Sequence, residues 1–197
     1  DLHRPTQAPK TLRETTRNED AIFSTAFSPE GRYMAAGTRK GNLLLWRIVA
    51  GTPVELTPIG EKLKLRKDKA AHQLKFSPRG EKLLVLNHLS GASGPEVLDM
   101  ATGKTVTVFN FRNNHKDLIH FFAGAFGDEN TVFLLSEKEF VVADASTGEE
   151  LRRYRWNAGF KSLTAARDGS RIVVGTKDGR VLVVSAAWLR ESQAEAQ

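Results

Sequence analysis

The sequence predicts an all-β fold in which four-stranded antiparallel sheets pack face to face around a common axis. The first observation is a phrase that occurs four times: a short apolar run, a tight turn ending in Gly or a substitute, and a second apolar run. Aligned on one position, the copies lie at Phe27, Phe76, Phe126 and Ala165, in steps of 49, 50 and 39 residues. A repeat of this length is a supersecondary unit that buries its faces only by stacking on its neighbours. The second observation is the shortness of the apolar runs themselves.

The first repeat, residues 20–60, shows how each unit divides into strands. We expect strands at residues 22–27, 32–37, 43–46 and 54–56. Between the first two, Ser28-Pro29-Glu30-Gly31 has Pro at the second position and Gly at the fourth, which is the chemistry of a type I turn. Short strands between Gly, Pro and Asp turns are typical of a meandering antiparallel sheet. A helical bundle is disfavoured because no 12-residue window has apolar residues spaced as on a capped helix face.

The later repeats cover residues 70–110, 111–155 and 156–188, and the third strands are the most alike. These third strands are Leu43–Trp46, Glu96–Asp99, Phe140–Ala143 and Val181–Val184. Their nearly continuous apolar character predicts burial on both faces, as in a sheet between two similar sheets. The first strands carry small residues, as expected where strands crowd toward an axis. We therefore predict four radial blades.

Several motifs resemble those of the WD-repeat family, in its divergent bacterial form. They are Phe-Ser-Pro-x-Gly at 27–31 and 76–80, Gly-Thr-Lys-Asp-Gly at 175–179, Trp-Arg at 46–47 where the family often has Trp-Asp, and Asp-x-x-Thr-Gly at 99–103 and 144–148. The resemblance covers roughly residues 10–188 and implies a β-propeller of four WD-like blades. The chain departs from the family pattern because no Gly-His precedes a first strand. Lys40 also stands where the structural Asp would be, so that only Asp178 keeps this residue.

The two ends of the chain indicate how the ring closes. The N-terminal arm, residues 1–19, has a spare strand at about 10–15, whereas the unit ending at Val184 has no fourth strand before the polar tail, residues 189–197. The family resemblance implies closure by a strand from the other end of a chain. Propellers have four to eight blades, and we expect that these four blades do not form a closed monomeric ring. A homodimer, a complementary chain or a larger parent protein would complete the propeller.

The composition is that of a soluble globular protein, with 40% hydrophobic and 26% charged residues. The absence of cysteine excludes disulfides and thiolate chemistry and fits a reducing compartment. No apolar run approaches the roughly 18 residues that span a membrane. We therefore expect a cytoplasmic protein with no membrane association. The net charge of +6 favours acidic partners or nucleic acid only where it is clustered on one face.

The sequence contains no recognisable catalytic, metal or cofactor motif. The five histidines have neither the i, i+4 spacing nor the acidic neighbours of a metal site. Gly91–Gly94 lies between strands rather than before a helix, which is not the context of a phosphate-binding loop. We predict no catalytic residues, no metal, no cofactor and hence no enzymatic activity.

The densest basic stretch lies in the connection between blades 1 and 2, residues 61–69. Its candidate partner-binding residues are Lys62, Lys64, Arg66 and Lys67. The alternation of Lys and Leu suits an outer strand that lysines protect from edge pairing, and this is the better interpretation. The alternative is a partner-binding segment. The stretch is too poor in aromatic residues to be a platform for single-stranded nucleic acid.

A second set of candidates lies in other connections on the same side of the predicted blades. Arg155 and Trp156 precede blade 4, where such a pair either anchors a partner or, through Trp156, fills the gap between two blades. Arg39, Lys40 and Lys177 lie in equivalent turns of the first and last repeats.

Taken together, the residues favour a non-catalytic protein–protein interaction scaffold of WD-repeat type. One alternative is a regulatory or sensor region of a larger signalling or defence enzyme. Another is a basic surface that binds nucleic acid. Folds of this kind serve unrelated tasks, so the fold itself does not choose among the three.

Overall fold

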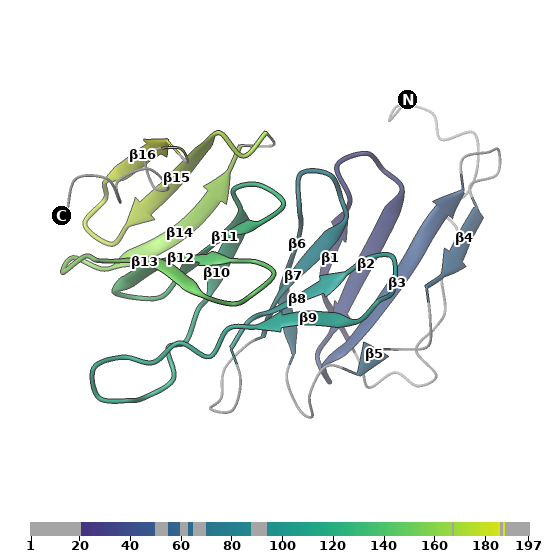
Figure 1. Ribbon diagram of the computed structural model, residues 1–197, viewed down its shortest axis with the longest axis horizontal. Coiled ribbons are helices and arrows are strands. Elements are labelled where there is room, and N and C mark those ends of the chain that lie inside the picture. The colour runs from purple at the N-terminus through teal and green to yellow at the C-terminus, as the bar shows by residue number, and fades with distance from the viewer. Residues whose placement is uncertain are drawn as a thin grey trace.

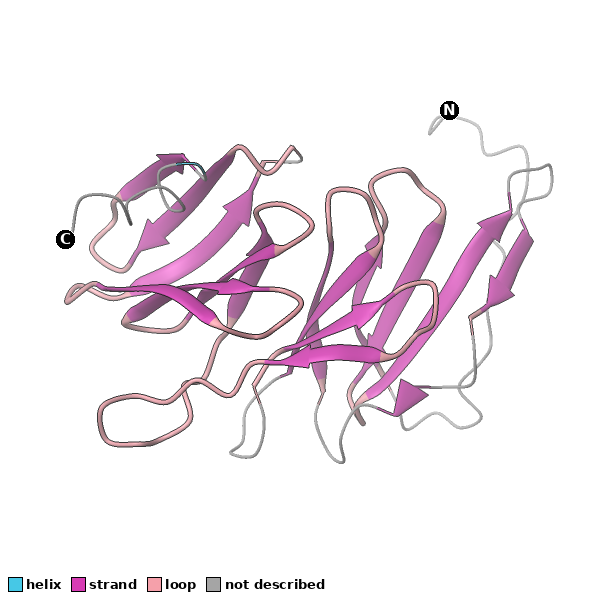
Figure 2. Cartoon of the chain, viewed as in Figure 1, coloured by secondary structure: helices cyan, strands magenta, loops and turns pink. Residues whose placement is uncertain are grey.

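The computed structural model describes residues 21–49, 55–59, 63–64, 70–87, 94–166, 168–185 and 187. Within these ranges the chain forms sixteen short strands in four antiparallel sheets, as Figures 1 and 2 show. The predicted all-β architecture of repeated sheets is confirmed. In the described part of the chain, no helix is both long and apolar enough to cross a membrane.

Each sheet corresponds to one sequence repeat and is called a blade below. Blade 1 contains β1 (Ile22–Phe27), β2 (Tyr33–Thr38), β3 (Asn42–Val49), β4 (Glu55–Pro58) and β5 (Leu63–Lys64). Blade 2 contains β6 (Ala71–Phe76), β7 (Lys82–Asn87), β8 (Glu96–Asp99) and β9 (Thr105–Val108). Blade 3 contains β10 (Ala123–Phe126), β11 (Thr131–Leu135), β12 (Glu139–Asp144) and β13 (Glu150–Arg155). Blade 4 contains β14 (Phe160–Ala165), β15 (Arg171–Thr176) and β16 (Val181–Ser185).

Glycine shapes the turn between the first two strands of three blades. A Gly N–H donates to the carbonyl at the first turn position in the pairs Gly31–Ser28, Gly80–Ser77 and Gly169–Ala166, each at 2.9 Å. These glycines have φ values of +72°, +71° and +68°, a region that L side chains rarely adopt. The recurring Gly of the sequence phrase is thus the residue that lets the chain reverse direction.

The outer edge of blade 1 consists of two short strands. β4 pairs with the second half of β3, between Trp46 and Val49, and β5 pairs with the start of β3 at Asn42 and Leu43. Because both run antiparallel along the same edge of β3, they act as one interrupted outer strand. The segment 61–69, expected to be a basic connection, therefore contributes two residues to this edge.

Apolar layers between neighbouring blades form the core. The layer between blades 1 and 2 includes Ala35, Leu45, Leu83 and Leu98. The next includes Leu84, Val97, Val132 and Val141. The third includes Phe133, Val142, Ile172 and Val174. Neighbouring blades meet mainly through their first strands, since β1 contacts β6, β6 contacts β10, and β10 contacts β14.

Blade 4 differs from the prediction that every third strand is buried on both faces. Val181 and Val183 of β16 are 69% and 64% exposed. The physical reason is that no further blade of the described chain covers this face, and no described strand pairs with the outer edge of β16. The predicted strand at about 10–15, the arm 1–19 and the tail 189–197 lie outside the described residues.

Candidate functional site

The connections between blades emerge at one end of the sheets. In a meander of four antiparallel strands, the turn between strands two and three lies at the same end as the connection to the next blade. This end, called the connection face below, carries the candidate residues of the sequence analysis that the structure describes. The opposite end carries the Gly turns.

A cavity of about 590 Å³ opens on the connection face. Its walls come from the 109–122 connection between blades 2 and 3, from the β11–β12 turn, and from the segment after β13. Arg155 and Trp156 line it together with the exposed residues Lys138 and Asn157. The structure thus brings two of the predicted partner-binding residues to a concave surface.

An ion-pair cluster centred on the buried Glu139 forms the floor of this cavity. Glu139, the first residue of β12, is 6% exposed. Its carboxylate accepts hydrogen bonds from Arg155 Nε at 3.1 Å and Nη2 at 3.0 Å, and from Arg153 Nη1 at 3.2 Å. Such pairing is required because an isolated buried carboxylate is costly. Arg153 also binds Glu150, and this hydrogen bond raises the pKa of the Arg153 guanidinium.

The same two arginines hold the 109–122 connection in place. Arg153 Nη1 donates to the Arg112 carbonyl at 2.9 Å, and Arg155 Nη2 donates to Asn114 Oδ1 at 2.9 Å. Within the connection, the Asn113 side chain accepts the backbone N–H groups of residues 115 and 117. The cavity wall is therefore an ordered loop tied to blade 3.

Trp156 and Lys177 connect this cavity to blade 4. Trp156 packs against the core layer between blades 3 and 4, with its ring 6.4 Å from that of Phe160. Lys177 forms an ion pair with Glu137 of the β11–β12 turn, and its N–H donates to the Gly159 carbonyl at 2.9 Å. Arg155, Trp156 and Lys177 therefore belong to one neighbourhood, and Trp156 also fills the space between two blades.

The other predicted residues do not join this neighbourhood in the described structure. Arg39 and Lys40 lie in the β2–β3 turn of blade 1, which is on the connection face but does not line the cavity. Lys64 belongs to β5. Lys62, Arg66 and Lys67 lie outside the described residues.

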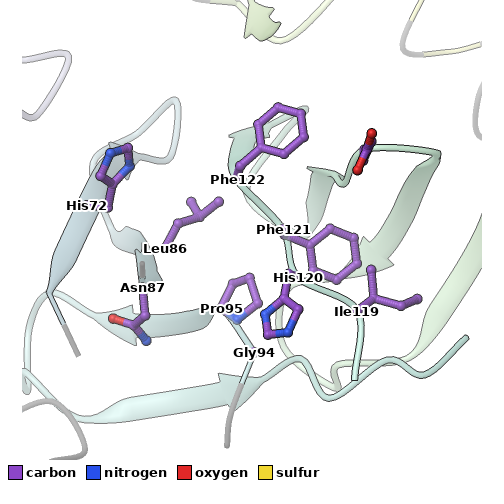
Figure 3. Close-up of a pocket in the computed structure, with 10 residues that line it drawn as sticks. His72, Leu86, Asn87, Gly94, Pro95, Ile119, His120, Phe121 and Phe122 are labelled. Atoms are coloured by element: carbon purple, nitrogen blue, oxygen red, sulfur yellow. The ribbon is translucent and has the colours of Figure 1, made fainter. Parts of the chain in front are cut away.

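A smaller cavity of about 280 Å³ lies beside the first, between blade 2 and the 109–122 connection (Figure 3). Figure 3 shows His72, Leu86 and Asn87 on one side and His120 and Phe122 on the other. Both side-chain polar atoms of Asn87 are buried without a hydrogen-bond partner among the described residues. Ile119, His120 and Glu137 line both cavities, so the two hollows form one continuous surface.

Glu137 and Glu139 belong to the candidate site but are not among the residues predicted from the sequence. A signal for Glu139 exists, because a charged residue that opens an otherwise apolar strand needs a cation beside it. Antiparallel pairing of β12 with β13 places Glu139 opposite Arg155, and this pairing could have been derived from the hairpin. In the described part of the chain, no cluster of three or more His, Asp or Glu side chains could hold a metal ion.

Comparison with known proteins gives evidence on the fold. No protein-family profile and no curated protein sequence matches the chain. Among solved structures, the chain is similar to the β-propeller domain of Cps50 (Swd1) from Myceliophteria thermophila, with a TM-score of 0.64 and 16% sequence identity over 89% of this chain and 56% of that one. This chain thus spans little more than half of that domain. The likeness and the four stacked sheets show a β-propeller fold of which the described residues supply four blades.

Proposed function

We propose that the protein is a non-catalytic interaction scaffold of WD-repeat type that binds a partner protein on the connection face of blades 2 to 4. The observation that carries the proposal is the 590 Å³ cavity with a fixed floor and a mixed apolar and charged rim. The ion pairs of Glu139 with Arg153 and Arg155 are already formed in the chain alone, before any partner protein binds. Binding would therefore require little ordering of this surface, which favours affinity.

The chemistry of the rim suits a protein partner better than nucleic acid. Trp and Arg are the residue types that most often anchor protein interfaces. The Arg155 side chain remains 51% exposed although it binds Glu139. Since carboxylates neutralise Arg153, Arg155 and Lys177, the cavity is not a strongly positive surface of the kind that phosphates require. The cysteine-free sequence fits the cytoplasm as the site of action.

The experiment compares partner capture by three forms of the protein. The double variant K138E/N157R alters two exposed residues of the cavity rim and none of the buried ion pairs. The variant K104E, at an exposed site in the turn after β8, is the matched control on the opposite end. Proteins bound to each form are quantified by mass spectrometry. We expect a set of proteins that the wild type and K104E retain and K138E/N157R loses.

Two results of the capture experiment would contradict the proposed site. A captured set that is the same for all three forms would place the partner surface elsewhere. Loss with K104E alone would move the binding site to the end of the Gly turns.

A further inference from the structure

Blade 4 ends in a face of the same kind as those buried between the other blades. Strand register makes Val183 equivalent to Leu45, Val97 and Val142 of blades 1 to 3. Those three side chains are 0–4% exposed, whereas Val183 is 64% exposed. All four are aliphatic residues, and the difference is that no described blade covers Val183. The outward face of blade 4 is therefore built as a blade interface.

The first strand of blade 1 shows the complementary surface. Phe27 is equivalent to Phe126 of blade 3, which is 4% exposed and packs against blade 2. Phe27 itself is 65% exposed, and Phe23 on the same strand is 50% exposed. Blades meet mainly through their first strands, so β1 exposes the very strand on which a preceding blade would pack.

The Gly turns give an independent indication of the same position. A Cβ at Gly80 of blade 2 would meet the Glu30 carboxylate of blade 1, and a Cβ at Gly169 of blade 4 would meet the Gly127 carbonyl of blade 3. Each turn thus abuts the preceding blade. A Cβ at Gly31 of blade 1, which has the same positive φ, would have nothing within 4 Å.

A Ser–Gly notch shows how one blade accepts the next. In blade 1, Ser24 pairs with Gly37, and Ser24 Oγ donates to the Ala71 carbonyl at the start of blade 2 at 2.7 Å. A Cβ at Gly37 would lie 2.8 Å from that carbonyl oxygen, so only Gly permits the approach. Blade 4 repeats the notch with Ser162 and Gly175, at the same register and after the same bulge. At Gly175, only the Ser162 side chain lies within 4 Å of the Cβ position, so no described residue of another blade occupies this notch.

We propose that the outward face of blade 4 docks β1 of a second copy of this chain, so that two copies close an eight-bladed ring. The position equivalent to Ala71 is Ile22, and its carbonyl would accept the Ser162 hydroxyl of the other copy. Eight blades lie within the range of known propellers. The two-fold arrangement uses the same pair of faces twice, as closed symmetry requires.

The sizes of the side chains support a second copy as the occupant. Blade 1 presents small residues, Ala26, Ala35 and Gly37, to the large Phe76 and Leu83 of blade 2. The outward face of blade 4 keeps the Gly, as Gly175, and carries Thr164 and a Val173 that is smaller than the equivalent Leu84 and Phe133 of blades 2 and 3. The exposed Phe27 of β1 supplies the large side that such a face accepts. The proposal is independent of the partner surface on the connection face.

The first experiment measures the mass of the full chain by light scattering at micromolar concentration. We expect twice the monomer mass of 21.8 kDa. The variants V183K and F27E each place a charge at the proposed interface, on side chains that are exposed within one copy. Each should weaken dimerisation at least about tenfold, because the interface would bury an unpaired charge. V106K, at an exposed valine of the outer strand β9, is the matched control and should remain dimeric.

Three results would overturn the proposal. They are a stable wild-type monomer, a dimer that neither V183K nor F27E weakens, and a monomer that acquires mass only with a different protein. Circular dichroism of each variant separates loss of dimer from loss of fold. K138E/N157R should leave the dimer unchanged, so failure of the scaffold proposal is distinguishable from failure of this one.

A second experiment traps the contact covalently. The chain has no cysteine, so I22C/S162C can form disulfides only between the two introduced residues. We expect a reducible covalent dimer on mild oxidation, and no such species with I22C alone or S162C alone, each of which supplies a cysteine on only one side of the interface. Failure of I22C/S162C to cross-link while V183K still prevents dimerisation would contradict the proposed register.

Discussion

At the scale of single residues, equivalent positions contribute differently to the free energy of unfolding, depending on whether a neighbouring blade covers them. Gly37 and Gly175 occupy the same place in their blades, yet only Gly37 faces a neighbouring backbone. We predict that G37A lowers the free energy of unfolding by about 1–3 kcal/mol through overpacking. G175A should change it by less than about 0.5 kcal/mol, because only the rotatable Ser162 hydroxyl is in the way. Urea unfolding of the two variants, measured at a concentration where the chain is monomeric, tests the contrast. Equal losses would contradict it.

Glu139 is the second residue with a decisive local role. Replacing it with Gln removes the charge that satisfies Arg153 and Arg155 but keeps nearly the same volume. We expect E139Q to cost about 1–2 kcal/mol, because it weakens charge-assisted hydrogen bonds, while Arg153 keeps Glu150 and the half-exposed Arg155 remains solvated. Hydrogen exchange should also accelerate in the 109–122 connection, which both arginines anchor. A variant with unchanged exchange there would show that the loop is held by other contacts. E150Q, at a more exposed partner of Arg153, is the control and should cost less.

At the scale of elements, two Asp-x-x-Thr-Gly turns give the protein a defined acid sensitivity. The Thr102 hydroxyl, followed by its N–H, lowers the pKa of Asp99 below its usual 3.8. For Asp144, partial burial raises the pKa, but hydrogen bonds from the N–H groups of Thr147 and Ser146 and from the Thr147 side chain, with the charge of Lys82, lower it below 3.8 overall. Because each carboxyl has a lower pKa folded than unfolded, its contribution is complete above the unfolded pKa and is lost as pH falls through the folded one.

The corresponding prediction concerns the slope of stability against pH. Between about pH 5 and pH 2.5, the wild type should lose stability steadily, and D99N/D144N should lose less over the same range. Thermal melts at closely spaced pH values give both slopes. Identical slopes for the double variant and the wild type would contradict the role of the two turns.

These elements also show what the sequence could and could not predict. The Gly and Pro turns, with the apolar third strands, were sufficient for the blades because they act through local backbone chemistry. The prediction that β16 is buried on both faces is wrong. An apolar sequence indicates that a strand is suited to burial, but it does not indicate whether a neighbouring blade is present to cover it. The role of Glu139 is not predicted from the sequence, because it depends on contacts with the cross-strand Arg155, which in turn binds a loop more than twenty residues away. The sequence predicts that Arg155 and Trp156 bind a partner protein, and the structure shows that both also make intramolecular contacts.

At the scale of the whole molecule, the net charge of +6 tests the nucleic-acid alternative. Five phosphate contacts from the basic stretch would give a slope of log affinity against log salt of about −4.5. We expect a slope shallower than about −2, with no sequence preference. Fluorescence anisotropy with labelled oligonucleotides at several salt concentrations measures it. Tight binding at physiological salt with the steep slope would instead make nucleic acid the leading partner.

The Ser–Gly notch has a consequence for how such a molecule can change over generations. The joint between blades 1 and 2 includes a hydrogen bond from the Ser24 hydroxyl to a main-chain carbonyl. Every residue carries such a carbonyl. The hydrogen bond therefore does not depend on which side chain follows, but the space does, because the Ala71 Cβ is the atom nearest to the open Cβ position of Gly37. Duplication or exchange of a whole repeat would therefore preserve the joint wherever the incoming side chain fits that space. Blades 1 and 4 share the Ser–Gly pair, whereas blade 2 has Gln73 and Leu86 at the same register, so the joint is tolerant of exchange but is not uniform along the chain.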